Sequence, residues 1–287
     1  MSTESPPAQP HIERFLGYSK ALDLTGIDFD DIPNHPLRED EIRILTYFMD
    51  VESNTIVYLK ELLSTPAIEV PEIQAFLSCW AYEEFFHGFA LKQFLRSYGV
   101  NIDENRTAVV AQSKNLIYHV RGFFQSLLSK AYGKRFIGVH MAWGAVNELT
   151  TAEGYLRIIA KTNHPILKEL LTRIMKDERR HFAFYFREAQ ERLADPKTAW
   201  ITSTLIRRFF EPVGADIRSL DEVDAVALMV LGDAEGLEVV RGVDRRIGTL
   251  PGLQGFRGVE DAIERTRARY GDKLGSLGQP TPAVAAT

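Results

Sequence analysis

The sequence predicts an all-α fold, and three observations lead to that prediction. Apolar residues recur at helical spacing through several long segments, whereas the alternation typical of strands is scarce. Clusters of glycine and proline punctuate the chain between these segments. The third observation is a pair of Glu-x-x-His motifs, Glu84 to His87 and Glu178 to His181, each within a helical pattern in which residues three apart share one face.

Taken in order, the main helices are expected over 37–64, 71–98, 135–162, 165–194, 197–210 and 221–247. Pro66 and Pro71 bracket the first connection, because the residue before a proline avoids helical geometry. Pro165 closes the tight link between the third and fourth helices. The stretch 99–134, which includes a shorter helix expected within 116–131, is then a long crossover.

The chain is expected to form one helical domain over 11–274, flanked by disordered tails at 1–10 and 275–287. Both ends contain proline and small residues without periodicity. The apolar content of 45% and charged content of 25% are ordinary for a globular protein. Cys79, the only cysteine, excludes an internal disulfide and a thiolate-rich metal site.

The charge and hydropathy patterns exclude further classes of function. A net charge of -5 argues against non-specific nucleic-acid binding. No apolar run approaches the roughly 20 residues that span a bilayer, and the start lacks the basic and apolar regions of a signal peptide. We therefore expect a cytoplasmic protein without membrane insertion.

Each Glu-x-x-His motif has a further glutamate about 30 residues upstream in the chain, so that one two-helix unit is used twice. All six residues fall in the apolar stripe of their helix and point inward. One Glu from each of two helices and Glu-x-x-His from two others form the ligand set of a carboxylate-bridged di-iron or di-manganese centre. The predicted metal ligands are Glu52, Glu84, His87, Glu148, Glu178 and His181.

The chemistry of these residues requires a cation. Burying four carboxylates without compensation is costly, and two divalent ions balance their charge. Oxygen and nitrogen donors without sulfur suit iron or manganese, and sites with open positions activate O2 in the iron case, so two iron ions are expected. Glu153 competes with Glu148 on the same helix, but it leaves the apolar face and fits the repeat spacing less well.

With these residues, the chain resembles the soluble acyl-acyl carrier protein desaturases, the stearoyl-type di-iron enzymes, particularly their actinobacterial members. The resemblance covers about residues 40–260 and is strongest at Trp80–Gly88 and Asp177–His181. It implies a ferritin-like four-helix bundle with a long crossover and additional C-terminal helices, and the same six ligands. It also implies a homodimer, ferredoxin or a similar reductant, and a deep apolar channel passing the metals. Plant members have Asn-Arg where this chain has Phe85-Phe86.

Three residues are expected to support the site. The family's Trp one turn before a ligand falls on Trp80, where electron transfer and plain core packing are the two interpretations. Its Thr falls on Thr151, which either guides a proton or bonds its own helix backbone. Asp177 either accepts a hydrogen bond from the non-ligating nitrogen of His87 or is solvated. Packing is the expected role of Tyr82, Tyr155 and Tyr185.

The leading functional hypothesis is an O2-dependent desaturase that introduces a cis double bond into a fatty acyl chain linked to acyl carrier protein. A related oxygenase that hydroxylates or N-oxidises a carrier-tethered metabolite is the alternative, since one site supports both outcomes. A ferroxidase or iron-storage protein is a third class, but such bundles are usually shorter. A radical protein of the ribonucleotide-reductase type would carry a Tyr where Leu91 stands.

Overall fold

A computed structural model of the chain describes residues 11–112, 128–129, 131–211, 213–215 and 217–270. All regular structure in these residues is helical, which confirms the predicted all-α class. The longer helices are α2 (Glu39–Ser53), α4 (Pro71–Ser97), α7 (Phe136–Lys161), α8 (Pro165–Arg192), α9 (Pro196–Phe209), α10 (Leu220–Leu231), α11 (Ala234–Ile247) and α12 (Gly258–Tyr270). Shorter ones are α1 (His11–Tyr18), α3 (Thr55–Leu63) and α5 (Arg106–Gln112), with 3-10 turns at Ile32–Asn34, Pro66–Glu69 and Gly133–Arg135.

Some expected features lie outside the described residues. The tail at 1–10 and the tail at 275–287 are among them. The short helix expected within 116–131 also falls largely outside, although Leu128 and Ser129 are helical.

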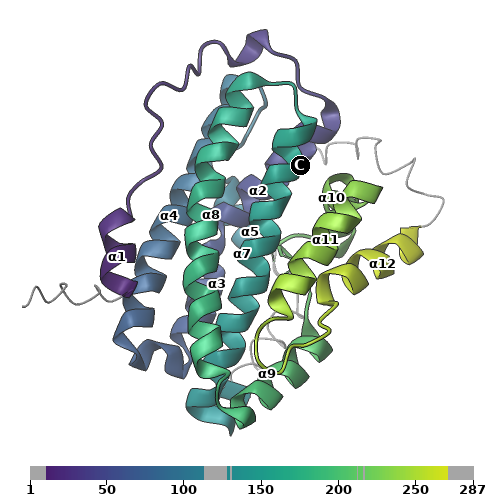
Figure 1. The fold of residues 1–287 in the computed structure, drawn as a ribbon. Coiled ribbons are helices and arrows are strands. Elements are labelled where there is room, and N and C mark those ends of the chain that lie inside the picture. Colours follow the sequence, from purple (N-terminus) through teal and green to yellow (C-terminus); the bar gives the residue numbers. More distant parts are fainter. Residues whose placement is uncertain (1–10, 113–127, 130, 212, 216, 271–287) are drawn as a thin grey trace, which may run out of the picture.

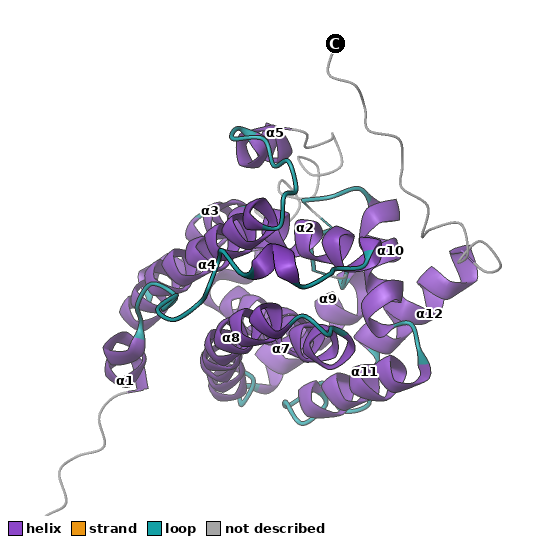
Figure 2. Cartoon of the chain, turned by 90° about the horizontal axis from the view of Figure 1, so that it is seen from above, coloured by secondary structure: helices purple, strands orange, loops and turns teal. Residues whose placement is uncertain are grey.

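Two long helix pairs form the centre of the molecule. α7 and α8 pack together along most of their length, and α2 packs with α4 in the same way. Contacts between α4 and α8 join the two pairs, and α1 packs on the outside of α4. The C-terminal helices α9, α10 and α11 pack against α7, with α12 against α10 and α11, so they cover one side of the pairs (Figures 1 and 2).

Local signals explain where these helices begin. Pro71, Pro165 and Pro196 each occupy the first turn of a helix, where the missing N–H costs no hydrogen bond. The side chain of His164 accepts a hydrogen bond from the Leu167 N–H at the start of α8. Asp195 caps α9 in the same way.

Two predicted helices are each interrupted in the structure. The helix expected over 37–64 ends at Ser53 and resumes at Thr55, because the side chain of Asn54 bonds the Asp50 carbonyl and takes that residue out of helical geometry. The helix expected over 221–247 breaks at Gly232 and restarts where Asp233 caps α11 through the Gly236 N–H.

A continuous apolar core runs through both pairs and continues under the C-terminal helices. Its fully buried members include Phe76, Leu91, Met141, Leu171 and Phe184. Phe76 and Phe184 stack with ring centroids 3.8 Å apart, which ties α4 to α8 next to His181. Among the described helices, none combines the length and apolar character needed to cross a membrane.

Candidate metal centre

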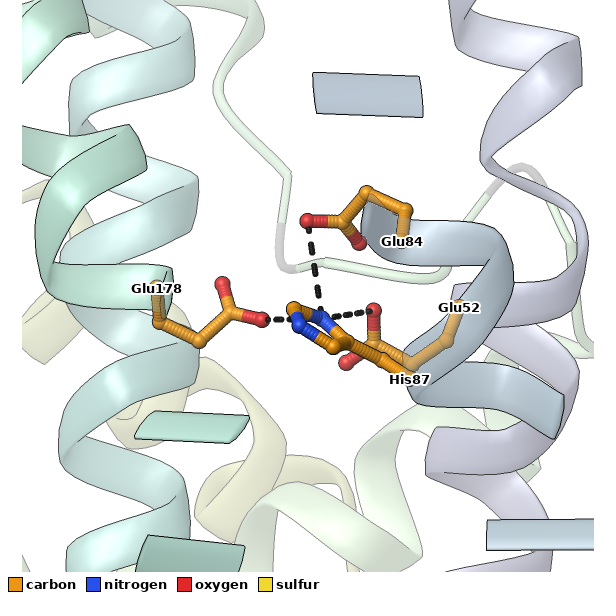
Figure 3. A group of neighbouring side chains, drawn as sticks. All are labelled: Glu52, Glu84, His87 and Glu178. Carbon is orange, nitrogen blue, oxygen red and sulfur yellow. Dashed lines mark ion pairs between the residues drawn. The ribbon is translucent and has the colours of Figure 1, made fainter. Parts of the chain in front are cut away.

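The structure brings all six predicted ligands together between the two helix pairs. Two overlapping groups form, and within each group one donor atom per residue lies within 4.8 Å of all the others. The first group is Glu52, Glu84, His87 and Glu178, and the second is Glu84, Glu148, Glu178 and His181. Glu84 and Glu178 belong to both groups, which is the arrangement of carboxylates that bridge two ions. Figure 3 shows Glu178 facing the other three residues of the first group.

Among the distances between the histidines and the glutamates of the cluster, the shortest join each histidine to a shared carboxylate. His87 Nδ1 lies 3.1 Å from Glu178 Oε1, and His181 Nδ1 lies 3.0 Å from Glu84 Oε1. Each histidine therefore faces a glutamate of the opposite helix. Glu52 Oε2 lies 3.9 Å from His87 Nδ1, and Glu148 Oε2 lies 3.5 Å from His181 Nδ1.

The four atoms of these two short contacts provide a test of whether a metal fits. All four are buried, and within the described part of the chain they meet only as ion pairs, without a hydrogen bond of regular geometry: Glu84 Oε1, His87 Nδ1, Glu178 Oε1 and His181 Nδ1. Buried polar atoms without hydrogen bonds are rare in native proteins and costly. Donors about 2.1 Å from one octahedral ion lie roughly 3 Å apart, as these pairs do. The donor set therefore fits metal ions that use oxygen and nitrogen ligands.

The outer nitrogen of each histidine is held by a carboxylate from the facing helix. His87 Nε2 lies 3.3 Å from Asp177 Oδ2, so the contact predicted for Asp177 is present. His181 Nε2 lies 2.7 Å from Glu83 Oε2. Arg180 joins the two carboxylates, with its Nη2 3.0 Å from Glu83 Oε1 and 2.5 Å from Asp177 Oδ1. Such partners orient a ligating imidazole and leave its other nitrogen free for metal.

The four-residue motif does not predict Glu83 or Arg180 as part of the site, although the repeat does contain a sequence feature that indicates Glu83. An acidic residue stands immediately before the ligand glutamate in both motifs, Glu83 before Glu84 and Asp177 before Glu178. The repeat therefore extends one residue further than the four-residue motif. Arg180 has no such counterpart, since Phe86 takes its place in the first motif.

The two upstream glutamates have different partners. The Trp80 indole N–H donates to Glu148 Oε1 at 3.0 Å, which gives Trp80 a contact with the cluster beyond core packing. The Tyr155 hydroxyl donates to Glu52 Oε1. The expectation that Tyr155 serves only for packing is therefore wrong. Thr55, at the start of α3, places its hydroxyl 3.5 Å from Glu84 Oε2.

The remaining predicted residues lie near the cluster with different environments. Glu153 belongs to neither group, so the carboxylate that α7 contributes to the cluster is that of Glu148. Thr151 is partly buried and lines a cavity beside the cluster. Tyr185 packs edge-on against Trp80. Tyr82 is half exposed on the outer face of α4, so it packs away from the ligand turns.

The cluster perturbs the ionisation of its own members. Burial raises the pKa of Glu52 and of Glu148 well above the ordinary glutamate value, and the nearby carboxylates raise both further. Burial alone would raise the pKa of Glu178 too, but the two imidazoles outweigh it and hold that pKa below its ordinary value. Burial lowers the pKa of His87, yet Asp177 and the cluster carboxylates outweigh burial and raise it to about 10. Bound cations would compete with protons for these carboxylates and imidazoles.

A close approach between two backbones sets the position of Glu52. A Cβ atom on Gly88 would lie 2.4 Å from Ser53 Oγ and 2.7 Å from the Ser53 backbone nitrogen. Only glycine leaves room for the end of α2 to rest directly on α4 at this point. Glu52 and His87 are the immediate neighbours of these two residues, so the contact fixes the ligands of the first group relative to each other.

A cavity of about 570 Å³ runs beside the cluster along α7. Four carboxylates of the cluster stand in its wall, while most of the other lining side chains are aliphatic or aromatic. The lining residues of α7 extend from Phe136 to Gly154, which corresponds to about 27 Å of helix. Gly144 lies in this wall, and a Cβ there would meet the Tyr185 ring at 2.4 Å.

The cluster and its cavity can hold metal ions next to a long, apolar molecule. No protein-family model matches the chain, and no curated protein is detectably similar to it.

Proposed function

We propose that the chain is a stearoyl-type acyl-acyl carrier protein desaturase that uses O2 and electrons from ferredoxin or a similar reductant to introduce a cis double bond into a carrier-linked acyl chain. The observation that carries the proposal is the position of the doubled Glu and His cluster in the wall of a long, mostly apolar cavity. Oxidation of an unactivated hydrocarbon needs both features at once. Iron storage needs only the first.

The proposal includes the ferritin-like bundle and the oligomeric state that the family resemblance implies. α2, α4, α7 and α8 would be the four bundle helices, the connection from α4 to α7 the crossover, and α9 to α12 the additional helices. The pairing of α2 with α4 and of α7 with α8 supports this assignment. Exposed aromatic side chains on the outer face of α4 support a homodimer, because apolar patches of this kind mark protein contacts: Tyr82, Phe85 and Phe89 are each about half exposed.

Two iron ions, when bound, would supply O2 activation and the removal of hydrogen from unactivated methylenes. The first group would hold one ion and the second group the other, with Glu84 and Glu178 shared. The oxygen and nitrogen donors support iron over metals that prefer thiolates. In the overall reaction, two hydrogen atoms leave adjacent methylenes, and with two electrons and two protons from outside they reduce O2 to two waters.

The chain's own residues would bind, orient and protect the substrate. The aliphatic and aromatic lining binds the acyl chain and excludes water from the reacting carbons. Trp80 and Tyr155 hold Glu148 and Glu52 by hydrogen bonds, so the carboxylates keep their positions as charge changes. Thr151 lines the cavity, and its hydroxyl would pass a proton there.

The experiment that tests the proposal is a product measurement on the iron-loaded protein with ferredoxin, its reductase and a panel of acyl-carrier proteins. Loss of two hydrogens from the acyl chain is the expected result. Gain of one oxygen would favour the alternative, a hydroxylating or N-oxidising enzyme at the same site. An unchanged acyl chain together with progressive iron mineralisation would refute both in favour of a storage protein.

A further inference from the structure

The cavity beside the cluster has two unlike ends. Towards α10 and α12 its lining is aliphatic and buried, with Val223, Val226, Val230, Val259, Ala262 and Ile263. Towards α9 the lining reaches the surface at Phe209, which is 53% exposed, whereas every other described lining residue is buried or partly buried. A long molecule would therefore place an apolar tail towards α10 and α12 and its head towards α9.

The part of α7 that α9 covers contains a buried polar group that the cluster does not use, two residues after Gly138, whose Cβ position lies against Thr198 and Thr202 of α9. His140 lies on α7, lines the cavity and is only 8% exposed. Its Nε2 has no hydrogen-bond partner among the residues that the structure describes. The Phe136 ring packs edge-on against the imidazole with centroids 4.7 Å apart, which restricts its orientation.

The charge state of His140 defines what it can bind. Burial lowers its pKa to about 4, so the imidazole is neutral at neutral pH. A neutral imidazole offers one N–H donor and one acceptor, and a carbonyl oxygen accepts from the donor without bringing a charge into the cavity. An anionic head group would gain no ion pair here. A wholly apolar occupant would leave the nitrogen unpaired.

We propose that His140 donates a hydrogen bond to the thioester carbonyl oxygen of the acyl substrate and so sets which methylenes lie against the Glu and His cluster. His140 and Glu148 are eight residues apart on α7, or about 12 Å along the helix axis. If the carbonyl is held at His140, the methylenes that react at the cluster lie about 12 Å further along the extended acyl chain. His140 is thus a positioning residue, and its role rests on the proposed function.

Binding of two matched probes to the metal-free protein tests this assignment without relying on activity. One probe is a long-chain acyl thioester of N-acetylcysteamine, and the other is the thioether of the same length without the carbonyl oxygen. The wild-type protein should bind the thioester about tenfold more tightly, because one buried hydrogen bond is lost with the thioether. His140→Leu should bind both probes equally, and His140→Gln should recover part of the preference.

Val226→Ala, at the apolar end, provides the control, since it should weaken both probes by the same factor. Equal binding of the two probes to the wild-type protein, or an undiminished preference in His140→Leu, would overturn the role of His140 while the proposed function stands. If neither probe binds the wild-type protein, the acyl cavity itself is refuted, and the proposed function fails with the inference. In turnover, His140→Leu should broaden the distribution of double-bond positions, which a merely structural role would not do.

Discussion

The helix pair α2/α4 and the helix pair α7/α8 contribute the same ligands but surround them differently. Each pair supplies one upstream glutamate and one Glu-x-x-His motif, and each motif's histidine is held by an acidic residue of the other pair. The environments differ at the upstream glutamates. α2 stops directly after Glu52 and rests on Gly88, whereas α7 continues unbroken past Glu148 and forms a wall of the cavity.

This difference indicates two separate requirements, one for binding metal and one for binding a substrate. The repeated ligands would suit two metal ions, because the two groups offer the same set of three glutamates and one histidine. The unequal surroundings would suit a long apolar substrate that lies mainly along α7. On α4 the residues between the ligands face outward, since Phe85 is 59% exposed. Both pairs line the cavity, but α7 lines it over the longer stretch, from Phe136 to Gly154, whereas α2 contributes residues from Tyr47 to Glu52.

The largest expected effect comes from removing one complete motif from either pair. Glu84→Ala with His87→Ala and Glu178→Ala with His181→Ala should each lower binding from about two ions per chain to less than one, since each double variant deletes a shared carboxylate. Metal analysis after anaerobic iron(II) loading measures this. Two iron ions per chain in either double variant would contradict the proposal that both motifs are needed to bind the metal.

A second comparison concerns the upstream glutamate of α7. Glu148→Ala should abolish or strongly alter the absorption of the oxidised cluster, because the carboxylate lies 3.5 Å from His181 and accepts from Trp80. Glu153→Ala should leave the spectrum intact, since Glu153 is outside both groups. If Glu153→Ala alters the spectrum and Glu148→Ala does not, Glu153 rather than Glu148 is the ligand from α7.

Intermediate effects are expected at the residues that hold the histidines. Glu83→Gln and Asp177→Asn should each weaken metal binding by about 10- to 100-fold, because each leaves one imidazole without its anionic partner. Glu72→Gln, at an exposed position in the first turn of α4, is the matched control and should have no effect. Titration with iron(II) under anaerobic conditions gives the affinities, and equal values for all three variants would remove Glu83 and Asp177 from the site.

The smallest effect tests the contact between the end of α2 and Gly88 of α4. Gly88→Ala should destabilise the fold by about 1–3 kcal/mol, because the added methyl group meets the backbone of Ser53. Gly17→Ala in α1 is the control, since a Cβ there meets nothing within 4 Å. Denaturant unfolding of the two variants measures the difference. Equal stability would mean that the α2 end is free to move away from α4.

Much of this architecture follows from the sequence because inward glutamates leave a strong trace in a helical pattern. The phase of Glu52, Glu84, Glu148 and Glu178 in their apolar stripes was sufficient to predict that they converge. The break at Asn54 was not predictable in the same way, since it depends on a side chain bonding its own backbone and on a contact with Gly88. The helical spacing of apolar residues continues across the break at Asn54, so the spacing gives no sign of it. The role of His140 is not predictable from the sequence either. A single histidine on an apolar helix face looks the same in the sequence whether or not its ring nitrogens have hydrogen-bond partners.

The most direct measurement is anomalous diffraction from crystals of the iron-loaded protein, recorded on both sides of the iron absorption edge. Two peaks are expected between the helix pairs, one beside Nδ1 of His87 and the other beside Nδ1 of His181, with Glu84 and Glu178 contacting both. A single peak, a peak outside the cluster, or none after loading that saturates the protein in solution would contradict the di-metal centre and the function built on it.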